Sequence, residues 1–322
     1  MTREEVLKAI ERTGPARVPV YYCNGDRSKS DLHDFAVQWH FSGSDGKASE
    51  WGFHWETMDG TMGQPVGPVI ADWSQAFTLE KPPINPEQRF AWAAGFLEEH
   101  RNDFTMANLS LSGFTTMTFI AGFEETLSAF YEEEEAVTAL ADTVFGFEED
   151  LIRASGELGF DSVHFVDDWG TQDDLIISPE LWRSFFKERY RRQFDLCREY
   201  GMKVFFHCCG NIRRIIPDFI ELGVDVLNLS QPNLFDIEQL GRDYGGKITF
   251  MCPVSYQTTS LSGSREEIFA DVARLVENLG CYNGGLLGYV EEYQSLGMSD
   301  NNYRSCVEAF RELGNYRRRS LV

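Results

Sequence analysis

The chain of 322 residues is 43 % hydrophobic and 25 % charged, a balance typical of a globular protein with a large core. Its 51 acidic residues against 29 basic ones give a formal net charge of -22, which argues against nucleic acid and anionic membranes as partners. No apolar stretch reaches the length of a membrane span, and Met1 to Glu5 lack a signal-peptide pattern, so we expect a cytoplasmic protein.

The first half of the chain contains two segments typical of strands, residues 17–22 and 104–109. Between them, residues 35–86 are rich in Trp, Gly and Pro and have weak periodicity, which predicts long loops and small hairpins. We therefore expect residues 23–100 to form an irregular N-terminal extension. Apolar residues at helical spacing predict a long helix over residues 136–158.

From Phe160 onward, short apolar strands alternate with amphipathic helices. Strands are predicted at 162–166, 203–206, 224–229, 248–252 and 284–290, and helices at 178–200, 212–222, 236–244, 264–279 and 301–313. Short connections between alternating strands and helices imply right-handed crossovers and a parallel sheet. We therefore predict a single domain over residues 1–322, a (β/α)8 TIM barrel whose mouth is covered by residues 23–100.

Polar side chains follow the predicted strands, where the active site of such a barrel lies. They are Asp167, Asp168, His207, Cys209, Ser230, Gln231, Cys252, Glu291 and Glu292. The absence of a G-x-G-x-x-G motif after the first strand removes the usual dinucleotide-binding signature. Gln172, Gln231 and Tyr256 are predicted to bind the substrate.

His207 and Cys209 form the most specific local pattern. Alternate residues of a strand share a face, so both side chains point to the same side, and imidazole and thiolate are preferred zinc ligands. Cys252 is a candidate third ligand and Glu291 a candidate fourth. The alternative is that Cys208 and Cys209 are ordinary buried cysteines and that His207 hydrogen-bonds a substrate.

Asp167 and Asp168 are adjacent, so only one of them can face the barrel mouth. We expect one to bind substrate or act as a general base and the other to cap the following loop, which makes Asp167, Asp168 and His207 the candidate catalytic residues. The alternative is that both carboxylates cap loops.

The segments DDWGTQ (167–172), ISPELW (177–182) and HCCGN (207–211) resemble the uroporphyrinogen-decarboxylase-like superfamily, as do residues 215–228. The resemblance is good from about Gly122 to the C-terminus and implies a (β/α)8 barrel. Within this superfamily, true uroporphyrinogen decarboxylases use no cofactor and bind their polycarboxylated substrate with an arginine-bearing N-terminal motif. Residues 21–27 lack that arginine-rich pattern, and a net charge of -22 is poorly suited to such a substrate.

The chain also resembles a second branch of this superfamily, the zinc-dependent, corrinoid-linked methyltransferases. Their zinc motif is H-x-C followed by a distant Cys. His207 and Cys209 match the first two positions, but glycines stand near 284–285 where the third Cys is expected, and Cys281 comes too early. Cys252 or Glu291 in its place suits methyl-ether substrates better than thiols.

The resemblance therefore implies a zinc-dependent methyltransferase that moves a methyl group between a small substrate, most plausibly a methoxylated aromatic, and the cobalt of a corrinoid. That corrinoid (cobalamin-type) cofactor is expected on a separate partner protein that docks over the barrel mouth. Two alternatives stay open: a cofactor-independent decarboxylase of the uroporphyrinogen type, and a non-catalytic barrel that binds a small molecule or a corrinoid protein.

Overall fold

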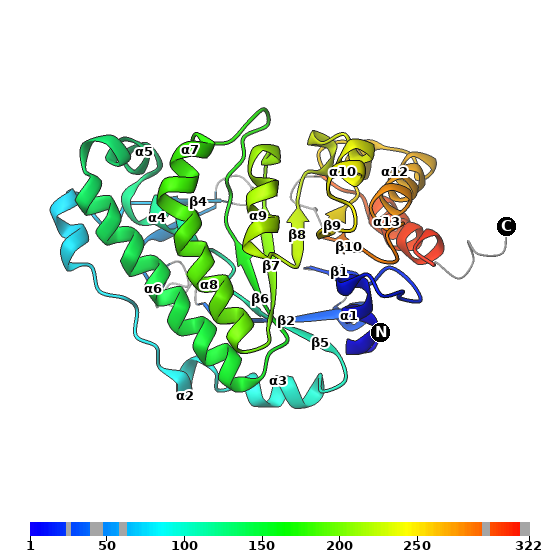
Figure 1. The fold of residues 1–322 in the computed structure, drawn as a ribbon, viewed down its shortest axis with the longest axis horizontal. Helices are drawn as coiled ribbons and strands as arrows, with labels where there is room; N and C mark the ends of the chain where they lie inside the picture. The colour runs from blue at the N-terminus through cyan, green and yellow to red at the C-terminus, as the bar shows by residue number, and fades with distance from the viewer. Residues whose placement is uncertain (24–26, 39–47, 58–62, 292–296, 316–322) are drawn as a thin grey trace.

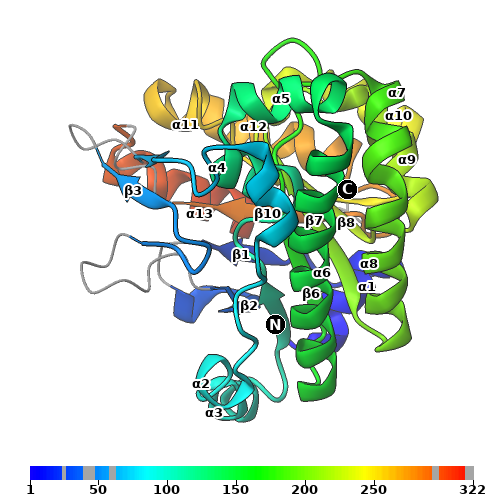
Figure 2. The same ribbon diagram turned by 90° about the vertical axis from the view of Figure 1, so that its left-hand side faces the viewer.

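The computed structural model describes residues 1–23, 27–38, 48–57, 63–291 and 297–315. Eight parallel strands form one sheet that curls into a nearly closed barrel with helices around it, which confirms the predicted (β/α)8 TIM barrel (Figures 1 and 2). In order around the barrel the strands are β1 (Val20–Tyr22), β2 (Leu32–Ala36), β5 (Phe104–Asn108), β6 (Ser162–Val166), β7 (Lys203–Cys208), β8 (Val226–Leu229), β9 (Thr249–Pro253) and β10 (Leu286–Val290). Across the seam between β1 and β2, the amide of Asp31 donates to the carbonyl of Val20 at 2.9 Å.

The helices include every one predicted from the sequence. They are α1 (Arg3–Glu11), α2 (Pro86–Arg89), α3 (Ala93–Glu99), α4 (Gly113–Ala121), α5 (Phe123–Glu132), α6 (Glu134–Leu158), α7 (Pro179–Leu181), α8 (Lys187–Glu199), α9 (Ile216–Leu222), α10 (Ile237–Tyr244), α11 (Thr259–Ser262), α12 (Arg265–Asn278) and α13 (Asp300–Leu313). The expected caps are present: the side chain of Ser178 accepts from the Leu181 amide, and Ser264 and Glu267 form a capping box. Within the described residues, no helix is both long and apolar enough to cross a membrane.

The strand β2 lies within the segment 23–100 and was not predicted, because its sequence LHDFA is short and polar. On its outer face, the Phe35 ring lies 5.4 Å from Phe96 of α3. The same segment contains the antiparallel hairpin β3 (His54–Glu56) and β4 (Gln64–Val66). That these residues cover the barrel mouth stays a prediction, and residues 24–26, 39–47 and 58–62 of this segment lie outside the described residues.

The bottom of the barrel interior is apolar and is closed by α1. Val6 and Ile10 of this helix pack against inward-facing side chains from the strands, namely Leu32, Phe104, Phe205, Val226, Met251 and Leu287. Val6 is fully buried and Ile10 is 2 % exposed. This plug leaves the carboxyl ends of the strands, at the opposite end of the barrel, as the place for a site.

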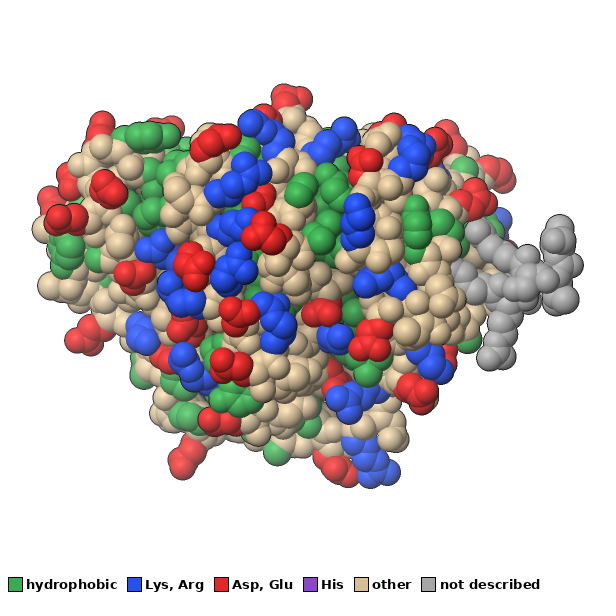
Figure 3. Space-filling view, viewed as in Figure 1, with side chains coloured by type: hydrophobic (Ala, Val, Ile, Leu, Met, Phe, Trp, Pro, Cys, Tyr) green, Lys and Arg blue, Asp and Glu red, His purple; other side chains and the backbone are tan. Residues whose placement is uncertain are grey.

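Charged side chains of both signs lie side by side over α8 and α9 on the face seen in Figure 3. The Lys187 ammonium lies 2.8 Å from the Asp218 carboxylate and 2.7 Å from that of Glu221, and the Arg183 guanidinium lies 2.9 Å from Asp218. Mixed pairs of this kind provide no continuous basic patch for the phosphates of nucleic acid.

One carboxyl group lies in the apolar layer between the sheet and the helices. Glu148 of α6 is fully buried and accepts hydrogen bonds from the Gly113 amide and from Nε2 of Gln193, both at 2.7 Å. Burial disfavours its charged form and raises the pKa of Glu148 to about 8.

We expect Ile10→Ala to lower the free energy of unfolding by about 2–5 kcal/mol, because the deletion leaves a cavity under the barrel floor. Urea denaturation followed by circular dichroism measures this change. Leu158→Ala is the matched control, since Leu158 is 38 % exposed. Equal losses in the two variants would contradict the role of α1 as a packed plug.

We expect the stability of the wild-type protein to depend on pH through Glu148. The folded protein holds this proton more tightly than the unfolded chain, so the contribution is present below the unfolded pKa of 4.5 and is lost as pH rises through about 8. Glu148→Gln cannot ionise, so it should need more urea than the wild type to unfold at pH 9 and a similar concentration at pH 5. The control is Glu157→Gln, an exposed position on the same helix. If the wild type and Glu148→Gln lose stability equally between pH 5 and 9, the assignment is wrong.

Candidate active site at the barrel mouth

Polar side chains replace the apolar ones at the carboxyl ends of the barrel strands. Asn108, His164, His207 and Asn228 follow the apolar floor on four neighbouring strands. Above them lies a cavity of about 340 Å³, lined by residues from strands all around the barrel. The lining includes Tyr21, Asn108, His164, His207, Cys209, Ser230, Tyr256, Tyr289 and Glu291.

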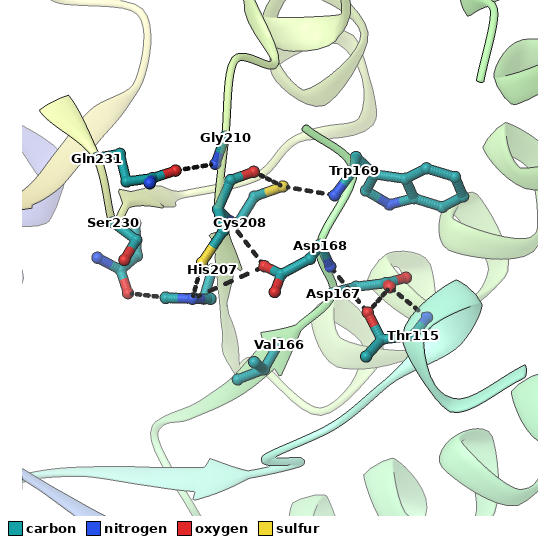
Figure 4. A network of polar contacts seen from close by, with 12 residues as sticks. Thr115, Val166, Asp167, Asp168, Trp169, His207, Cys208, Gly210, Ser230 and Gln231 are labelled. Carbon is teal, nitrogen blue, oxygen red and sulfur yellow. Dashed lines mark hydrogen bonds and ion pairs between the residues drawn. The ribbon is translucent and has the colours of Figure 1, made fainter. Parts of the chain in front are cut away.

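Three potential metal ligands meet at one side of this cavity. Asp168, His207 and Cys209 offer ligand atoms that all lie within 4.8 Å of one another. Nε2 of His207 is 3.6 Å from the Cys209 sulfur and 4.0 Å from Oδ1 of Asp168 (Figure 4). The same Asp168 oxygen accepts from the Cys209 amide at 2.7 Å, which ties the loop after β6 to the loop after β7.

The orientation of His207 is fixed by its neighbour on β8. Asn228 is paired in register with His207, and its Oδ1 lies 2.6 Å from Nδ1 of the imidazole. Asn228 Nδ2 donates to the Met251 carbonyl at 2.9 Å, so the amide oxygen must face His207 and Nδ1 must carry the proton. The lone pair of Nε2 is therefore directed toward Cys209 and Asp168, as in a metal-binding histidine held by an outer hydrogen bond.

The electrostatics of the cluster fit a cation. Burial, and next the charge of Asp168, raise the pKa of the Cys209 thiol well above its usual range. A cation among these ligands would offset both effects, because it stabilises the thiolate and the carboxylate together. One imidazole, one thiolate and one carboxylate are ligands that zinc accepts, and three protein ligands leave a position for substrate.

The two adjacent carboxylates point in opposite directions, as alternation along the chain requires. Asp168 is 43 % exposed and faces the mouth, whereas Asp167 is fully buried on the outer side (Figure 4). Asp167 accepts hydrogen bonds from the amides of Phe114 and Thr115 at 2.9 and 2.8 Å and from the Tyr190 hydroxyl, so it caps the N-terminus of α4.

The position of the Asp167 carboxylate also explains why residue 113 is a glycine. Gly113 begins α4 with φ of +50°, and a Cβ there would collide with the carboxylate of Asp167. Burial raises the pKa of Asp167 to about 7, although the hydrogen bonds that this carboxylate accepts lower it. The structure thus places Asp167 away from the cavity, in a position to hold α4 beside the mouth.

Two predicted metal ligands are not brought to the cluster. On β9, Met251 faces the barrel interior and Cys252 faces the outer apolar layer, because neighbouring residues of a strand alternate. Glu291 follows β10, lines the cavity and accepts from the Tyr289 hydroxyl at 2.9 Å, but it is not within ligand reach of the other three. Cys281 is exposed in the turn before β10. Asp168, which the sequence suggested only as a catalytic residue, is instead the third potential ligand beside His207 and Cys209.

The predicted substrate-binding residues differ in their placement. Tyr256 lines the cavity, with its hydroxyl 3.3 Å from Oγ of Ser230. Gln231 is buried and accepts from the Gly210 amide at 2.7 Å, which supports the loop that carries Cys209. Gln172 is exposed and accepts from Gln257 at 3.2 Å, outside the lining of the cavity. Glu292 lies outside the described residues.

Sequence reasoning missed His164 and Asn228. Both lie inside strands rather than at strand ends, two residues before Val166 and Ser230, and both face inward. The available signal was a polar residue at an inward position of a buried strand, where an apolar side chain is usual.

A second group of potential ligands lies on the outer side of β2. His33, His100 and Asp103 offer ligand atoms within 4.8 Å of one another. The two imidazole rings stack at 3.9 Å, and Nδ1 of His100 lies 3.1 Å from Oδ2 of Asp103. Any measurement of metal content must therefore separate this group from the barrel mouth.

One solved structure has the same architecture over almost the whole chain. The structure is similar to a methyltransferase from Methanosarcina mazei, with a TM-score of 0.71 and 15 % sequence identity over 97 % of this chain and 99 % of that one, which shows a shared fold. It is also similar, with a TM-score of 0.43 and 9 % identity, to an endo-β-1,4-xylanase from Gloeophyllum trabeum, over 72 % of this chain and 82 % of that one. No curated protein sequence matches the chain. The family model of uroporphyrinogen decarboxylase (URO-D) matches residues 58–285, more than half of the chain, which therefore belongs to that family.

Proposed function

We propose that this protein is a zinc-dependent methyltransferase that takes a methyl group from a methoxylated aromatic compound and passes it to the cobalt of a corrinoid on a partner protein. The observation that carries the proposal is the group of Asp168, His207 and Cys209 at the edge of the mouth cavity. The similar fold of a methyltransferase supports the same class of reaction.

Different residues of this chain would hold the metal, orient its histidine ligand and position the loop that carries Asp168. Asp168, His207 and Cys209 would hold the zinc ion, which supplies Lewis acidity to an ether oxygen. Asn228 keeps the lone pair of His207 Nε2 free, because its Oδ1 accepts a hydrogen bond from the N–H of Nδ1. Asp167 acts indirectly, because it fixes α4, whose Thr115 hydroxyl accepts from the Asp168 amide at 3.0 Å.

The substrate would lie in the cavity with its methoxy group toward these ligands. Tyr21, Tyr256 and Tyr289 line the cavity and offer ring surfaces to an aryl group. In the proposed reaction the bond between oxygen and methyl carbon would break, the corrinoid cobalt(I) of the partner would supply the acceptor for the methyl group, and the aryl oxygen would leave as a phenolate that takes up a proton from water. A second protein would reach the reacting carbon from the carboxyl ends of the strands, where the cavity lies.

A decarboxylase of the uroporphyrinogen type has less support from this lining. Among the described residues that line the cavity there is no Lys or Arg, and Glu291 adds an acidic group. A substrate with many carboxylates requires basic partners in its site.

We expect the protein purified in the presence of zinc to carry about one zinc per chain at the barrel mouth. Elemental analysis measures the content, and the double variant His207→Ala, Cys209→Ala should lose this ion while keeping the far-ultraviolet circular dichroism of the wild type. The matched control is His33→Ala, His100→Ala, which removes the other group of ligands and should keep the mouth zinc. A wild-type protein without zinc, or a loss of zinc in the control only, would refute the proposed site.

We expect Asn228→Ala to weaken zinc binding roughly 10- to 100-fold, because an outer hydrogen bond orients the imidazole and raises its basicity. Competition with a chromophoric chelator gives the dissociation constant. Asn233→Ala, at an exposed position after β8, should leave it unchanged. Equal affinities of wild type and Asn228→Ala would show that the hydrogen bond has no part in metal binding.

A further inference from the structure

His164 is a buried imidazole to which no described residue offers a hydrogen bond. It is 5 % exposed on β6, and neither Nδ1 nor Nε2 has a partner among the described residues. Its ring contacts are with Phe205 and His207, at 6.2 and 6.3 Å between centroids. A buried polar group that lacks a partner costs free energy, so such groups are rare in folded proteins unless a ligand or a water molecule satisfies them.

The position of His164 makes a bound molecule the natural partner. His164 lines the same cavity as His207 and Cys209. It lies deeper in the barrel than His207, because His207 is paired in register with Val166, two residues after His164 on β6. Asn108, paired with His164 in register, lies at the same depth on β5. A molecule that reaches His164 therefore also lies beside the ligand group at the mouth.

The charge of the surrounding residues limits what this molecule can be. The described lining holds Glu291 and has no Lys or Arg. Asp34, below the cavity, lies 3.2 Å from Nδ2 of Asn108, and the Arg27 guanidinium is 3.6 Å from Asp34 rather than in the lining. The two positive charges of a zinc ion would be balanced by the Asp168 carboxylate and the Cys209 thiolate. A carboxylate on the substrate would thus be buried without a basic partner among the described residues, which is unfavourable.

We infer that the substrate is an uncharged aryl methyl ether with a second oxygen function, and that His164 binds this second oxygen. The geometry that carries the inference is the unpartnered imidazole in the wall of the cavity, next to His207. A hydroxyl group can accept from the N–H of a neutral imidazole or donate to its other nitrogen, so a methoxyphenol fits this wall. His164 is then a residue that determines specificity, while the chemistry stays with the mouth group. This inference rests on the proposed function.

Binding of three probes to the zinc-loaded protein tests the inference without turnover. The probes are 2-methoxyphenol, methoxybenzene and 4-hydroxy-3-methoxybenzoate, measured by isothermal titration calorimetry at pH 7.5. We expect 2-methoxyphenol to bind about tenfold more tightly than methoxybenzene, which lacks the second oxygen, because one buried hydrogen bond is lost. The benzoate should bind at least about tenfold more weakly than 2-methoxyphenol, because its carboxylate has no basic partner.

Two substitutions separate recognition from structure. His164→Phe keeps a ring of similar shape but removes both nitrogens, so it should abolish the preference for 2-methoxyphenol over methoxybenzene. Its zinc content and its resistance to urea should stay at least at the wild-type level. His164→Gln keeps a donor and an acceptor and should restore part of the preference. His54→Phe, an exposed position on the hairpin, is the matched control and should change neither affinity.

The outcomes distinguish this inference from the proposed function. A full preference for 2-methoxyphenol in His164→Phe would overturn the inference, and so would benzoate binding as tight as that of 2-methoxyphenol; zinc at the mouth would still support the methyltransferase. A wild-type protein that carries no zinc yet keeps a preference that depends on His164 would refute the methyltransferase and leave the recognition of an uncharged oxygenated ring supported.

Discussion

The side chains of a barrel strand alternate between the interior and the outer layer, and the chemistry of this protein depends on how that alternation falls at each strand end. Asp168 and Cys209 face the mouth, whereas Asp167, Cys208 and Cys252 face outward, although all five are polar residues at or beyond strand ends. A shift of one residue in one of these strands would exchange the inward-facing and outward-facing side chains of that strand. The outward-facing side chains have structural roles: Asp167 caps α4, and the Cys208 sulfur accepts a hydrogen bond from the Trp169 amide at 3.1 Å.

Two carboxyl groups buried on the outer side of the sheet help to build the site. Asp167 and Glu148 meet the first amides of α4, and burial raises the pKa of both. The partial positive charge of a helix N-terminus offsets part of their desolvation cost. Through Thr115, this helix reaches back to the amide of Asp168, so the inner carboxylate is positioned by the outer one.

The interior of the barrel is divided into an apolar half and a polar half with different tasks. The floor of Leu32, Phe104 and Met251 against α1 supplies packing. The polar half contains His164, His207 and Asn228, and the His164 imidazole has no hydrogen-bond partner among the described residues. Proteins retain such unfavourable groups where they serve recognition, which is the reason to connect His164 with a ligand rather than with stability.

The sequence by itself determined the barrel, the helices from residue 136 onward and the pair His207 and Cys209, because periodicity, caps and the spacing of two residues are local properties. It did not reveal β2, since five residues with two polar side chains give no strand signal without their neighbours. Only the tertiary structure decided which side chain lies beside His207 and Cys209: Cys252 and Asp168 are equally acceptable by position, and alternation along the chain turns Asp168 inward and Cys252 outward. The same holds for Asn228 and His164, whose roles follow from what stands beside them on the next strand and not from their neighbours in the chain.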